Sequence, residues 1–166
     1  MGRVGVGIEW AMTESTDVVT VERLIPAPAS EIFDLIADPS RHRDIDGSGT
    51  VRAAKGAGEG QKVSLGSTFG MSMKMGLPYS MSSTVIEYEE DRLLAWQTRG
   101  PGPIGKLVGG RIWRYELEPV EGGTLVKETW DITQESPLTK LGVRGLGKKT
   151  AGNMSATLAR IEKILA

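Results

Sequence analysis

The chain has 166 residues, 39% of them hydrophobic and 25% charged, with a net charge of −1 and no cysteine. This length suits one domain that buries about 70% of its unfolded surface. The composition argues against a dedicated nucleic-acid binder, which needs a basic surface, and excludes disulfides and thiolate metal sites. No apolar run approaches a membrane span, and residues 1–16 lack the features of a signal peptide. We therefore expect a poorly ordered leader over 1–16, a single domain over 17–166, a cytoplasmic location and no integral membrane association.

The first predicted elements are a strand and a short helix. Val18–Ile25 is β-branched and apolar, which is typical of a strand. Within Pro28–Ala37 the apolar residues have helical spacing, and Pro28 suits the first turn. Asp38-Pro39 ends this helix, because the residue before proline disfavours helical angles. A second short helical turn is expected through Ser40–Asp44.

Strand signals then dominate from Gly47 to Thr133. The predicted strands are Val51–Ala54, Ser67–Met75, Ser80–Glu89, Arg92–Arg99, Arg111–Pro119 and Thr124–Thr133. A flexible loop is expected over Lys55–Gln61, and a long glycine- and proline-rich connection over Arg99–Gly110. Within Ser67–Met75 the strand period places Phe69, Met71, Met73 and Met75 on one side. The three methionines form a stripe on that side. These flexible side chains suit either a core or an adaptable lining for an apolar ligand.

The last two strands form a hairpin whose register can be predicted. A two-residue turn at Glu121-Gly-Gly123 pairs odd positions of the first strand with even positions of the second. Trp113, Tyr115 and Leu117 then share a face with Val126, Glu128, Trp130 and Ile132. The opposite face is charged, so one face of the sheet is predicted to be core and the other solvated.

Glu128 is the unusual residue of this hairpin, because it lies in the apolar phase between Val126 and Trp130. A carboxylate there is unfavourable unless it is paired or hydrogen-bonded. One interpretation is a structural ion pair, with Arg111 as the partner, or a position near the rim of the sheet. The other is a polar anchor or general acid/base in a pocket, with a pKa raised by burial.

The C-terminal stretch Pro137–Ala166 predicts a helix that covers the apolar face of the sheet. Ser136-Pro137 is a typical start, and the spacing from Met154 onward is clearly helical. Each of Gly142, Gly145, Gly147 and Gly152 disfavours a helix by about 1 kcal/mol relative to alanine. Either the helix begins near Lys148, or close packing requires the glycines. Lys140, Arg144 and Lys148 form a basic line that suits a solvated face, with weak attraction to anionic membranes as the alternative.

Several motifs match known sites by letters only. Gly100–Gly105 fits G-x-G-x-x-G, but two prolines remove backbone donors and strands follow, so no nucleotide site is expected. Gly142–Lys148 resembles a P-loop but lacks the following Ser or Thr. His42, the only histidine, has no second His or any Cys for a zinc site, and we expect it in a surface turn. We therefore expect no metal and no cofactor.

The segment Val19–Asp46 (VTVERLIPAPASEIFDLIADPSRHRDID) resembles the opening of the START-like (SRPBCC) superfamily, and in particular its polyketide cyclase/dehydrase and lipid-transport group. VIEYEEDRLLAWQTR, WRYELEPVEGGTLVKETWDI and a terminal helix follow in the family's order. The resemblance implies an α+β helix-grip fold: a curved antiparallel sheet of about seven strands around a long C-terminal helix, with two short helices after the first strand. It also implies a cavity for lipids, sterols, polyketides or plant hormones, but it assigns no catalytic residue.

Three functions remain open. The first is binding, transport or sequestration of a small hydrophobic molecule such as a lipid or polyketide-like compound. The second is a cyclase or dehydratase that uses Glu128 as acid/base, with Tyr115 or Arg111 as helpers. The third is a protein-interaction module with a filled core. In the first two, Gly100–Gly110 would act as an entrance lid, and in the third as a plain loop. The predicted cavity residues are Met71, Met73, Met75, Trp96, Arg111, Trp113, Tyr115, Glu128 and Trp130.

Overall fold

A computed structural model describes residues 17–49, 51–55, 62–75 and 77–166, and only the backbone for 51–55, 73–75 and 77–79. The predicted leader 1–16 and all but the first residue of the predicted loop Lys55–Gln61 lie outside these residues. The described strands are β1 (Val18–Ile25), β2 (Val51–Lys55), β3 (Thr68–Met75), β4 (Leu77–Glu89), β5 (Leu93–Arg99), β6 (Gly109–Val120) and β7 (Gly123–Asp131). The helices are α1 (Ala29–Ile36), η1 (Pro39–Arg41), α2 (His42–Ile45), η2 (Gly102–Lys106), α3 (Pro137–Arg144) and α4 (Gly147–Leu165), where η marks a 3-10 helix.

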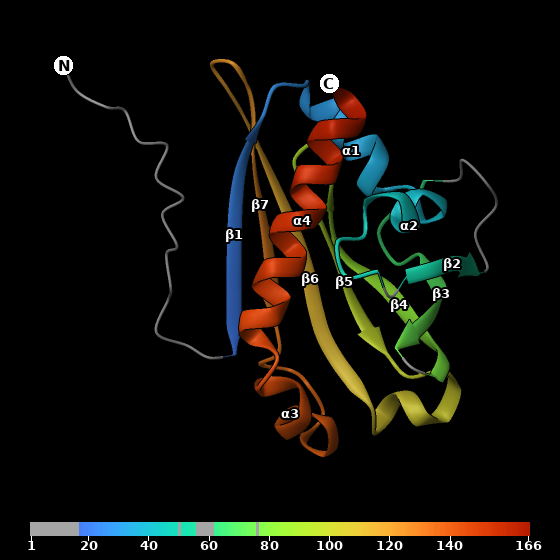
Figure 1. Cartoon of the computed structure of the whole chain (residues 1–166). Coiled ribbons are helices and arrows are strands. Elements are labelled where there is room, and N and C mark those ends of the chain that lie inside the picture. Colours follow the sequence, from blue (N-terminus) through green and yellow to red (C-terminus); the bar gives the residue numbers. More distant parts are fainter. Residues whose placement is uncertain (1–16, 50, 56–61, 76) are drawn as a thin grey trace.

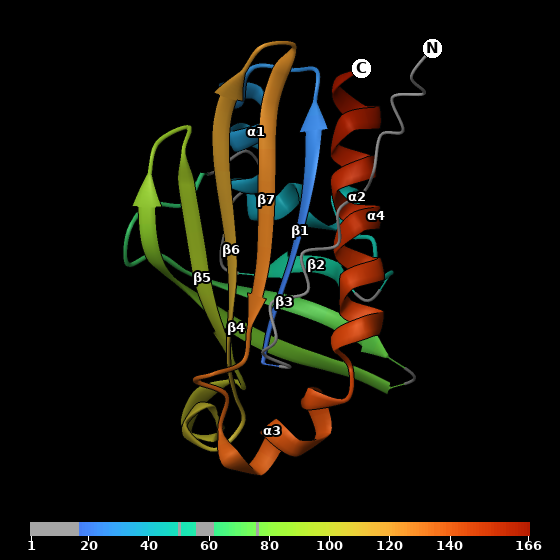
Figure 2. The ribbon, with the colours of Figure 1, turned by 90° about the vertical axis from the view of Figure 1, so that its left-hand side faces the viewer.

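The described strands form one seven-stranded sheet in the order β1-β7-β6-β5-β4-β3-β2, with antiparallel neighbours throughout. The sheet is strongly bent, so that β3 and β4 run across the direction of β1, β6 and β7 (Figure 2). The long helix α4 lies over one side of the bent sheet, together with α1 and α2 (Figure 1). This arrangement confirms the α+β helix-grip fold and the two short helices after the first strand.

The register of the last hairpin is the one that its sequence predicts. Trp113 faces Trp130, Tyr115 faces Glu128, and Leu117 faces Val126 across the β6–β7 pair. The turn at its tip needs glycine, because Gly123 has a φ of 147° and an added Cβ would lie 2.8 Å from Pro26 Cα. The same turn therefore fixes both the strand register and the approach of the chain segment after β1.

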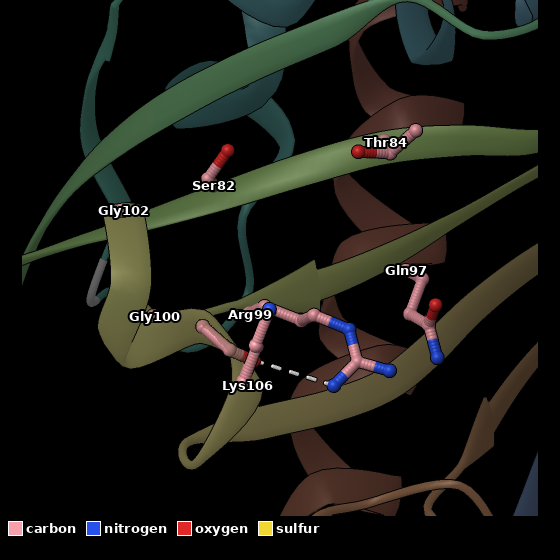
Figure 3. A pocket seen from close by; sticks show the side chains of 8 residues that line it. Ser82, Thr84, Gln97, Arg99, Gly100, Gly102 and Lys106 are labelled. Carbon is pink, nitrogen blue, oxygen red and sulfur yellow. Dashed lines mark hydrogen bonds between the residues drawn. The ribbon is translucent and has the colours of Figure 1, made fainter.

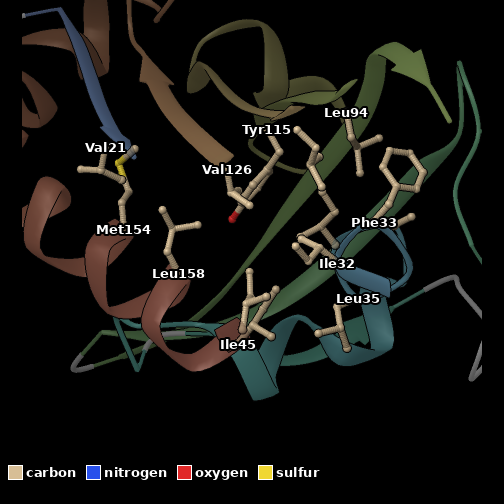
Figure 4. Packing of buried hydrophobic residues seen from close by; sticks show 14 of the residues in the cluster. Val21, Ile32, Phe33, Leu35, Ile45, Leu94, Tyr115, Val126, Met154 and Leu158 are labelled. Carbon is tan, nitrogen blue, oxygen red and sulfur yellow. The ribbon is translucent and has the colours of Figure 1, made fainter. Parts of the chain in front are cut away.

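The hydrophobic core lies between the inner face of the sheet and the helices. Met154, Leu158 and Ile161 of α4 are at most 1% exposed, and the first two point toward Val21 on β1 and Ile45 on α2 (Figure 4). Residues Ile32, Phe33, Leu35 and Ile36 of α1 are buried as their spacing predicts. Each such side chain contributes about 1.5–3 kcal/mol when it leaves water.

The C-terminal stretch consists of two helices rather than one. α3 ends at Arg144, and α4 begins at Gly147, close to the predicted alternative of Lys148. A Cβ added to Gly142, Gly145 or Gly152 would contact nothing within 4 Å, so close packing does not explain these glycines. The interpretation of a later start for the long helix is therefore the correct one.

The position of α4 depends on one close backbone approach. Gly47, directly after α2, donates its N–H to Thr157 Oγ1 of α4 at 2.9 Å. A Cβ at Gly47 would lie 2.6 Å from the backbone nitrogen of Thr157 and would collide with the carbonyl oxygen of Asn153. Only glycine allows α2 and α4 to pack at this distance.

Gly47→Ala should therefore lower the free energy of unfolding by about 1–3 kcal/mol, because the two backbones must separate. The matched control is Gly152→Ala, at an exposed helical position where the new methyl group meets nothing. It should raise stability by about 0.5–1 kcal/mol. Urea unfolding of both variants measures the two effects, and equal stability of Gly47→Ala and the parent chain would contradict this account.

Candidate functional site

A cavity of about 260 Å³ lies between the first half of α4, α2 and the inner face of the sheet. The sheet contributes residues that alternate toward this side: Phe69, Met71, Met81, Ser83, Trp96, Thr98, Arg111, Trp113, Tyr115, Glu128 and Trp130. The helices and the segments next to them contribute His42, Ile45, Asp46, Ser48, Leu146, Lys149, Thr150, Asn153, Met154 and Thr157. Most of the surface of this wall is apolar and aromatic, although about half of the lining residues carry a polar or charged group.

The aromatic part of the wall is one continuous cluster. The ring of Trp96 stacks on His42, with centroids 5.2 Å apart and planes at 21°. Phe69 meets Trp96 edge to face at 5.8 Å, and Tyr115 lies 5.7 Å from Trp96 on its other side. Such contacts stabilise a pair of rings by about 0.5–1.5 kcal/mol beyond area burial. The cluster gives the cavity a preformed flat wall.

The prediction that His42 lies in a surface turn is wrong, because its side chain is only 8% exposed. Its Nε2 lies 2.8 Å from the carbonyl oxygen of Ile36, and because a carbonyl only accepts, this nitrogen carries the proton. Burial lowers the pKa of His42 despite this hydrogen bond. The ring is therefore neutral at physiological pH and acts as an aromatic wall residue.

Glu128 lies at the floor of the cavity and is 2% exposed. Its Oε1 accepts a hydrogen bond of 2.8 Å from the Tyr115 hydroxyl, while Oε2 has no partner among the described residues. Burial raises the pKa of Glu128 to about 8, and the charge of Asp46 adds to this rise, whereas the Tyr115 hydrogen bond opposes it. At neutral pH the carboxyl group is protonated, and Oε2 is the oxygen left to carry the proton.

Arg111 does not pair with Glu128, which corrects the predicted ion pair. Its Nη2 lies 3.0 Å from Oε1 of Glu135, a residue whose side chain is fully buried. Glu135 Oε1 also accepts from Thr139 Oγ1 at 2.7 Å. Arg111 lies near the start of β6, close to the segment that precedes α3, so Glu135 reaches it first. Glu128 lies on β7 opposite Tyr115, which is four β6 positions beyond Arg111, and is left with this neutral partner.

The cavity opens at the beginning of α4. Of the described residues that line it, only Leu146 and Lys149 are exposed, and both lie at the start of this helix. Deeper inside, Ser83 Oγ and Thr98 Oγ1 hydrogen-bond to each other at 2.9 Å and are buried. A ligand would thus pass a cationic and aliphatic rim before it reaches an aromatic wall and two polar spots.

Seven predicted cavity residues line the hollow: Met71, Trp96, Arg111, Trp113, Tyr115, Glu128 and Trp130. The side chains of Met73 and Met75 lie outside the described part of the chain. Their contribution to ligand binding stays a prediction. The residues that line the cavity without having been assigned to it from the sequence include His42, Phe69 and the polar residues of α4 such as Asn153. Phe69 shares the phase of Met71, so the alternation of that strand could have indicated it.

A second hollow lies on the side of the sheet that faces away from α4. It is an open groove of about 490 Å³ lined by Ser82, Thr84, Gln97, Arg99, Gly100, Gly102, Gly105 and Lys106 (Figure 3). The neighbours Ser83 and Thr98 point into the inner cavity instead. The structure thus places residues of Arg99–Gly110 beside this groove, and only Arg111 beyond them reaches the cavity. The predicted entrance lid is therefore wrong.

The comparison with known proteins agrees with this architecture. The family model described as polyketide cyclase / dehydrase and lipid transport matches residues 16–166. The chain belongs to this family. The uncharacterized protein Rv0088 of Mycobacterium tuberculosis is 36% identical over 144 residues, which cover 82% of this chain. The chain spans 59% of the length of this relative.

Solved structures show the same fold at low sequence identity. Protein CV1439 from Chromobacterium violaceum has a TM-score of 0.67 at 12% identity, covering 91% of this chain and 98% of that one. DynU16, from the dynemicin biosynthetic locus, has a TM-score of 0.63 at 15% identity, covering 90% of this chain and 47% of that one. At such identities the likeness shows the fold of the polyketide cyclase/dehydrase and lipid-transport family alone.

The described residues of this family member contain neither a metal-binding group nor a membrane-spanning helix. They contain no group of three or more His, Asp or Glu side chains placed to hold a metal ion. None of their helices is long and apolar enough to cross a membrane.

The raised pKa of Glu128 predicts a specific pH dependence of stability. The unfolded chain loses this proton near pH 4.5, and the folded chain only near pH 8. Between these values the folded state binds more protons, so this group lowers stability by about 1.4 kcal/mol per pH unit as pH rises. Glu128→Gln removes the effect. Its stability relative to the parent chain should therefore increase from about pH 5 to pH 8 and then level off.

Urea unfolding at a series of pH values measures this difference. Tyr115→Phe is the informative control, because it removes the hydrogen bond that lowers the pKa of Glu128. When Glu128→Gln is added to Tyr115→Phe, the stability difference between the double and the single variant should level off at a higher pH than it does in the parent chain. Parallel profiles for the parent chain and Glu128→Gln would show that Glu128 is ionised in the folded protein.

Proposed function

We propose that the chain binds one small, largely apolar molecule in the cavity between α4 and the sheet. The observation that carries the proposal is the aromatic cavity that ends on the buried Glu128, with Oε2 unpartnered within the described chain. Its volume of about 260 Å³ lies near the lower end of the usual range for small-molecule sites. Membership of a family described as polyketide cyclase/dehydrase and lipid transport supports the same class of ligand.

The wall chemistry narrows the ligand. The flat surface of Trp96, His42 and Tyr115 suits an aromatic or polyene ring system, which stacks favourably on such rings. A protonated Glu128 is a hydrogen-bond donor, so it suits a carbonyl or hydroxyl oxygen of the ligand. An anionic group at that depth is disfavoured, because Arg111, the cation that lines the inner part of the cavity, is already paired with Glu135. We therefore propose a planar apolar molecule with a neutral oxygen at its inner end.

An empty cavity of this size would be unfavourable. At about 24 cal/mol per Å³, a dry void of this volume lowers stability by about 6 kcal/mol, against a total of about 5–15 kcal/mol for a domain. The polar groups on the wall can hold water when no ligand is present. Exchange of that water for an apolar ligand is the driving force for binding in this proposal.

Catalysis is the second candidate, and one observation favours it. A carboxyl group with a pKa of about 8 can both give and take a proton near neutral pH. Tyr115 is hydrogen-bonded to it, and the pKa of Tyr115 is raised well above its ordinary value by burial and by Glu128. This pair could act as acid and base on an enolisable polyketide-like substrate. The third candidate, an interaction module with a filled core, has less support, because α4 leaves the cavity open.

Native mass spectrometry of the freshly purified chain tests the binding proposal directly. We expect an additional mass from a co-purified apolar molecule that is lost on denaturation. Because a ligand can dissociate during purification, a second measurement uses the neutral fluorescent probe N-phenylnaphthylamine. The probe should bind with one site per chain, and absence of both signals would contradict the proposal.

A variant that fills the cavity sharpens this test. Asn153 lines the cavity from α4, so Asn153→Trp should place an indole in the ligand space and weaken probe binding by at least about tenfold. Lys163→Trp, on the exposed part of the same helix, adds the same side chain without entering the cavity. Equal probe affinity in both variants would show that the probe binds elsewhere.

Glu128→Gln separates binding from catalysis. The molecule recovered from the purified chain is incubated with the parent chain and with the variant, and its mass is followed. A binder leaves the molecule unchanged, and the variant only alters affinity. An enzyme converts it, and the variant loses most turnover, by about 100-fold or more, because its amide cannot transfer the proton.

A further inference from the structure

One end of the molecule carries an unusual share of exposed apolar side chains. Figures 1 and 2 place α3 and the yellow coil of η2 at the same end, opposite the C-terminus. Leu138 and Leu141, three residues apart on α3, are 71% and 80% exposed. Leu107 and Ile104 at η2 are 62% and 54% exposed. We call these four side chains the leucine end.

The two segments of the leucine end are fixed to each other. Ser136 Oγ donates to the carbonyl oxygen of Leu107 at 2.7 Å, and Ser136 N–H donates to Gly109 at 2.7 Å. Gly109 N–H in turn lies 3.3 Å from Thr139 Oγ1. The exposed leucines therefore belong to one hydrogen-bonded unit rather than to two independent loops.

The same unit is strongly basic, although the whole chain is nearly neutral. Residues 99–111 and 136–150 contain seven Lys and Arg residues and no Asp or Glu. Lys140 and Arg144 pair with Asp17, and Arg111 pairs with Glu135. Lys106, Lys148 and Lys149 have no ion pair within the described part of the chain. Positive charge and exposed leucine thus coincide on this end.

We propose that the leucine end docks on the surface of an anionic lipid bilayer. Protruding leucines with lysines beside them are the composition of membrane-surface elements, in which apolar side chains enter the interface and the cations meet lipid phosphates. A protein partner fits less well, because protein interfaces are depleted in Lys and their energetic centres are poor in Leu.

The cavity mouth lies next to the leucine end, which suggests why this surface would dock on a bilayer. Leu146 and Lys149, the exposed residues of the cavity rim, directly follow α3 along the chain. Docking through α3 therefore brings the mouth close to the bilayer, where an apolar ligand could enter without crossing water. This role rests on the proposed function, whereas the docking itself does not.

Vesicle flotation with the full chain tests the docking. We expect binding to phosphatidylcholine vesicles that contain phosphatidylglycerol, and much weaker binding to phosphatidylcholine alone. Lys148→Glu should weaken binding by at least about fivefold, because one lysine near an anionic surface already contributes about that factor. Leu138→Ser with Leu141→Ser should weaken it by at least about tenfold.

Matched controls lie at the other end of the molecule. Lys163→Glu changes the same charge at an exposed site near the opposite end of α4. Leu24→Ser with Ile164→Ser removes side chains that are 49% and 40% exposed. Both controls should bind vesicles as the parent chain does, and circular dichroism verifies that every variant is folded. Asn153→Trp should also still dock, so that a failure of the ligand proposal is separate from a failure of docking.

Three outcomes would overturn the proposal. The parent chain could fail to bind anionic vesicles, or the variants at the leucine end could bind as well as the controls. Alternatively, the chain could fail to bind vesicles but form a dimer in sedimentation experiments. If Leu138→Ser with Leu141→Ser dissociates that dimer, the leucine end binds a second copy of the chain instead. Binding to soluble poly-glutamate without vesicle binding would indicate an acidic protein instead.

Discussion

The close approach of α4 to the segment after α2 is the constraint on which the cavity depends. It is set where Gly47 meets the backbone of α4 at Asn153 and Thr157. The C-terminal half of the helix is thereby held against β1 and α1, where Leu158 and Ile161 fill the space. The cavity lies along its first half, where every side chain except Met154 is small or polar. The hollow thus results from the placement of the helix and from the small side chains that it directs toward the sheet there.

The protonation state of Glu128 follows from its pairing with a neutral group instead of with Arg111. Arg111, which shares a phase with the residues opposite Glu128, is paired with Glu135, and Thr139 donates a hydrogen bond to the same Glu135 oxygen. Glu128 is then left with the neutral Tyr115 hydroxyl, which is too weak a partner to offset burial. The carboxylic acid on Tyr115 and the His42 ring stacked on Trp96 are thus polar but uncharged groups of the wall. Such a wall can recognise an oxygen atom without requiring a charged ligand.

The sequence predicted the fold well, because local patterns and long-range pairing agree in it. The β6–β7 register follows from one two-residue turn and one alternation, and it is confirmed residue by residue. The resemblance carried by Val19–Asp46 supplied the helix-grip architecture. The helix break at Gly145 was left open, because glycine content alone cannot distinguish a late start from close packing.

The sequence predicted the site less completely. Residues on strands could be placed, since alternation tells which face each side chain takes. The contributions of α2 and α4 could not, because they depend on how these helices dock. His42 shows the reason: its turn has the composition of a surface loop, but the carbonyl of Ile36 and the ring of Trp96 hold it inside. The partner of Glu128 was likewise decided by three-dimensional proximity.

The pairing of β1 with β7 has a consequence for how the chain reaches its native state. Val18 faces Asp131, so the edge strand β1 pairs with a strand that follows it by more than a hundred residues. During synthesis β1 therefore stays unpaired until most of the protein has left the ribosome. Contacts of such long sequence separation form slowly. Exposed strand edges in partly folded chains also invite association with other chains. A demand on chaperones during biosynthesis is therefore built into the topology itself.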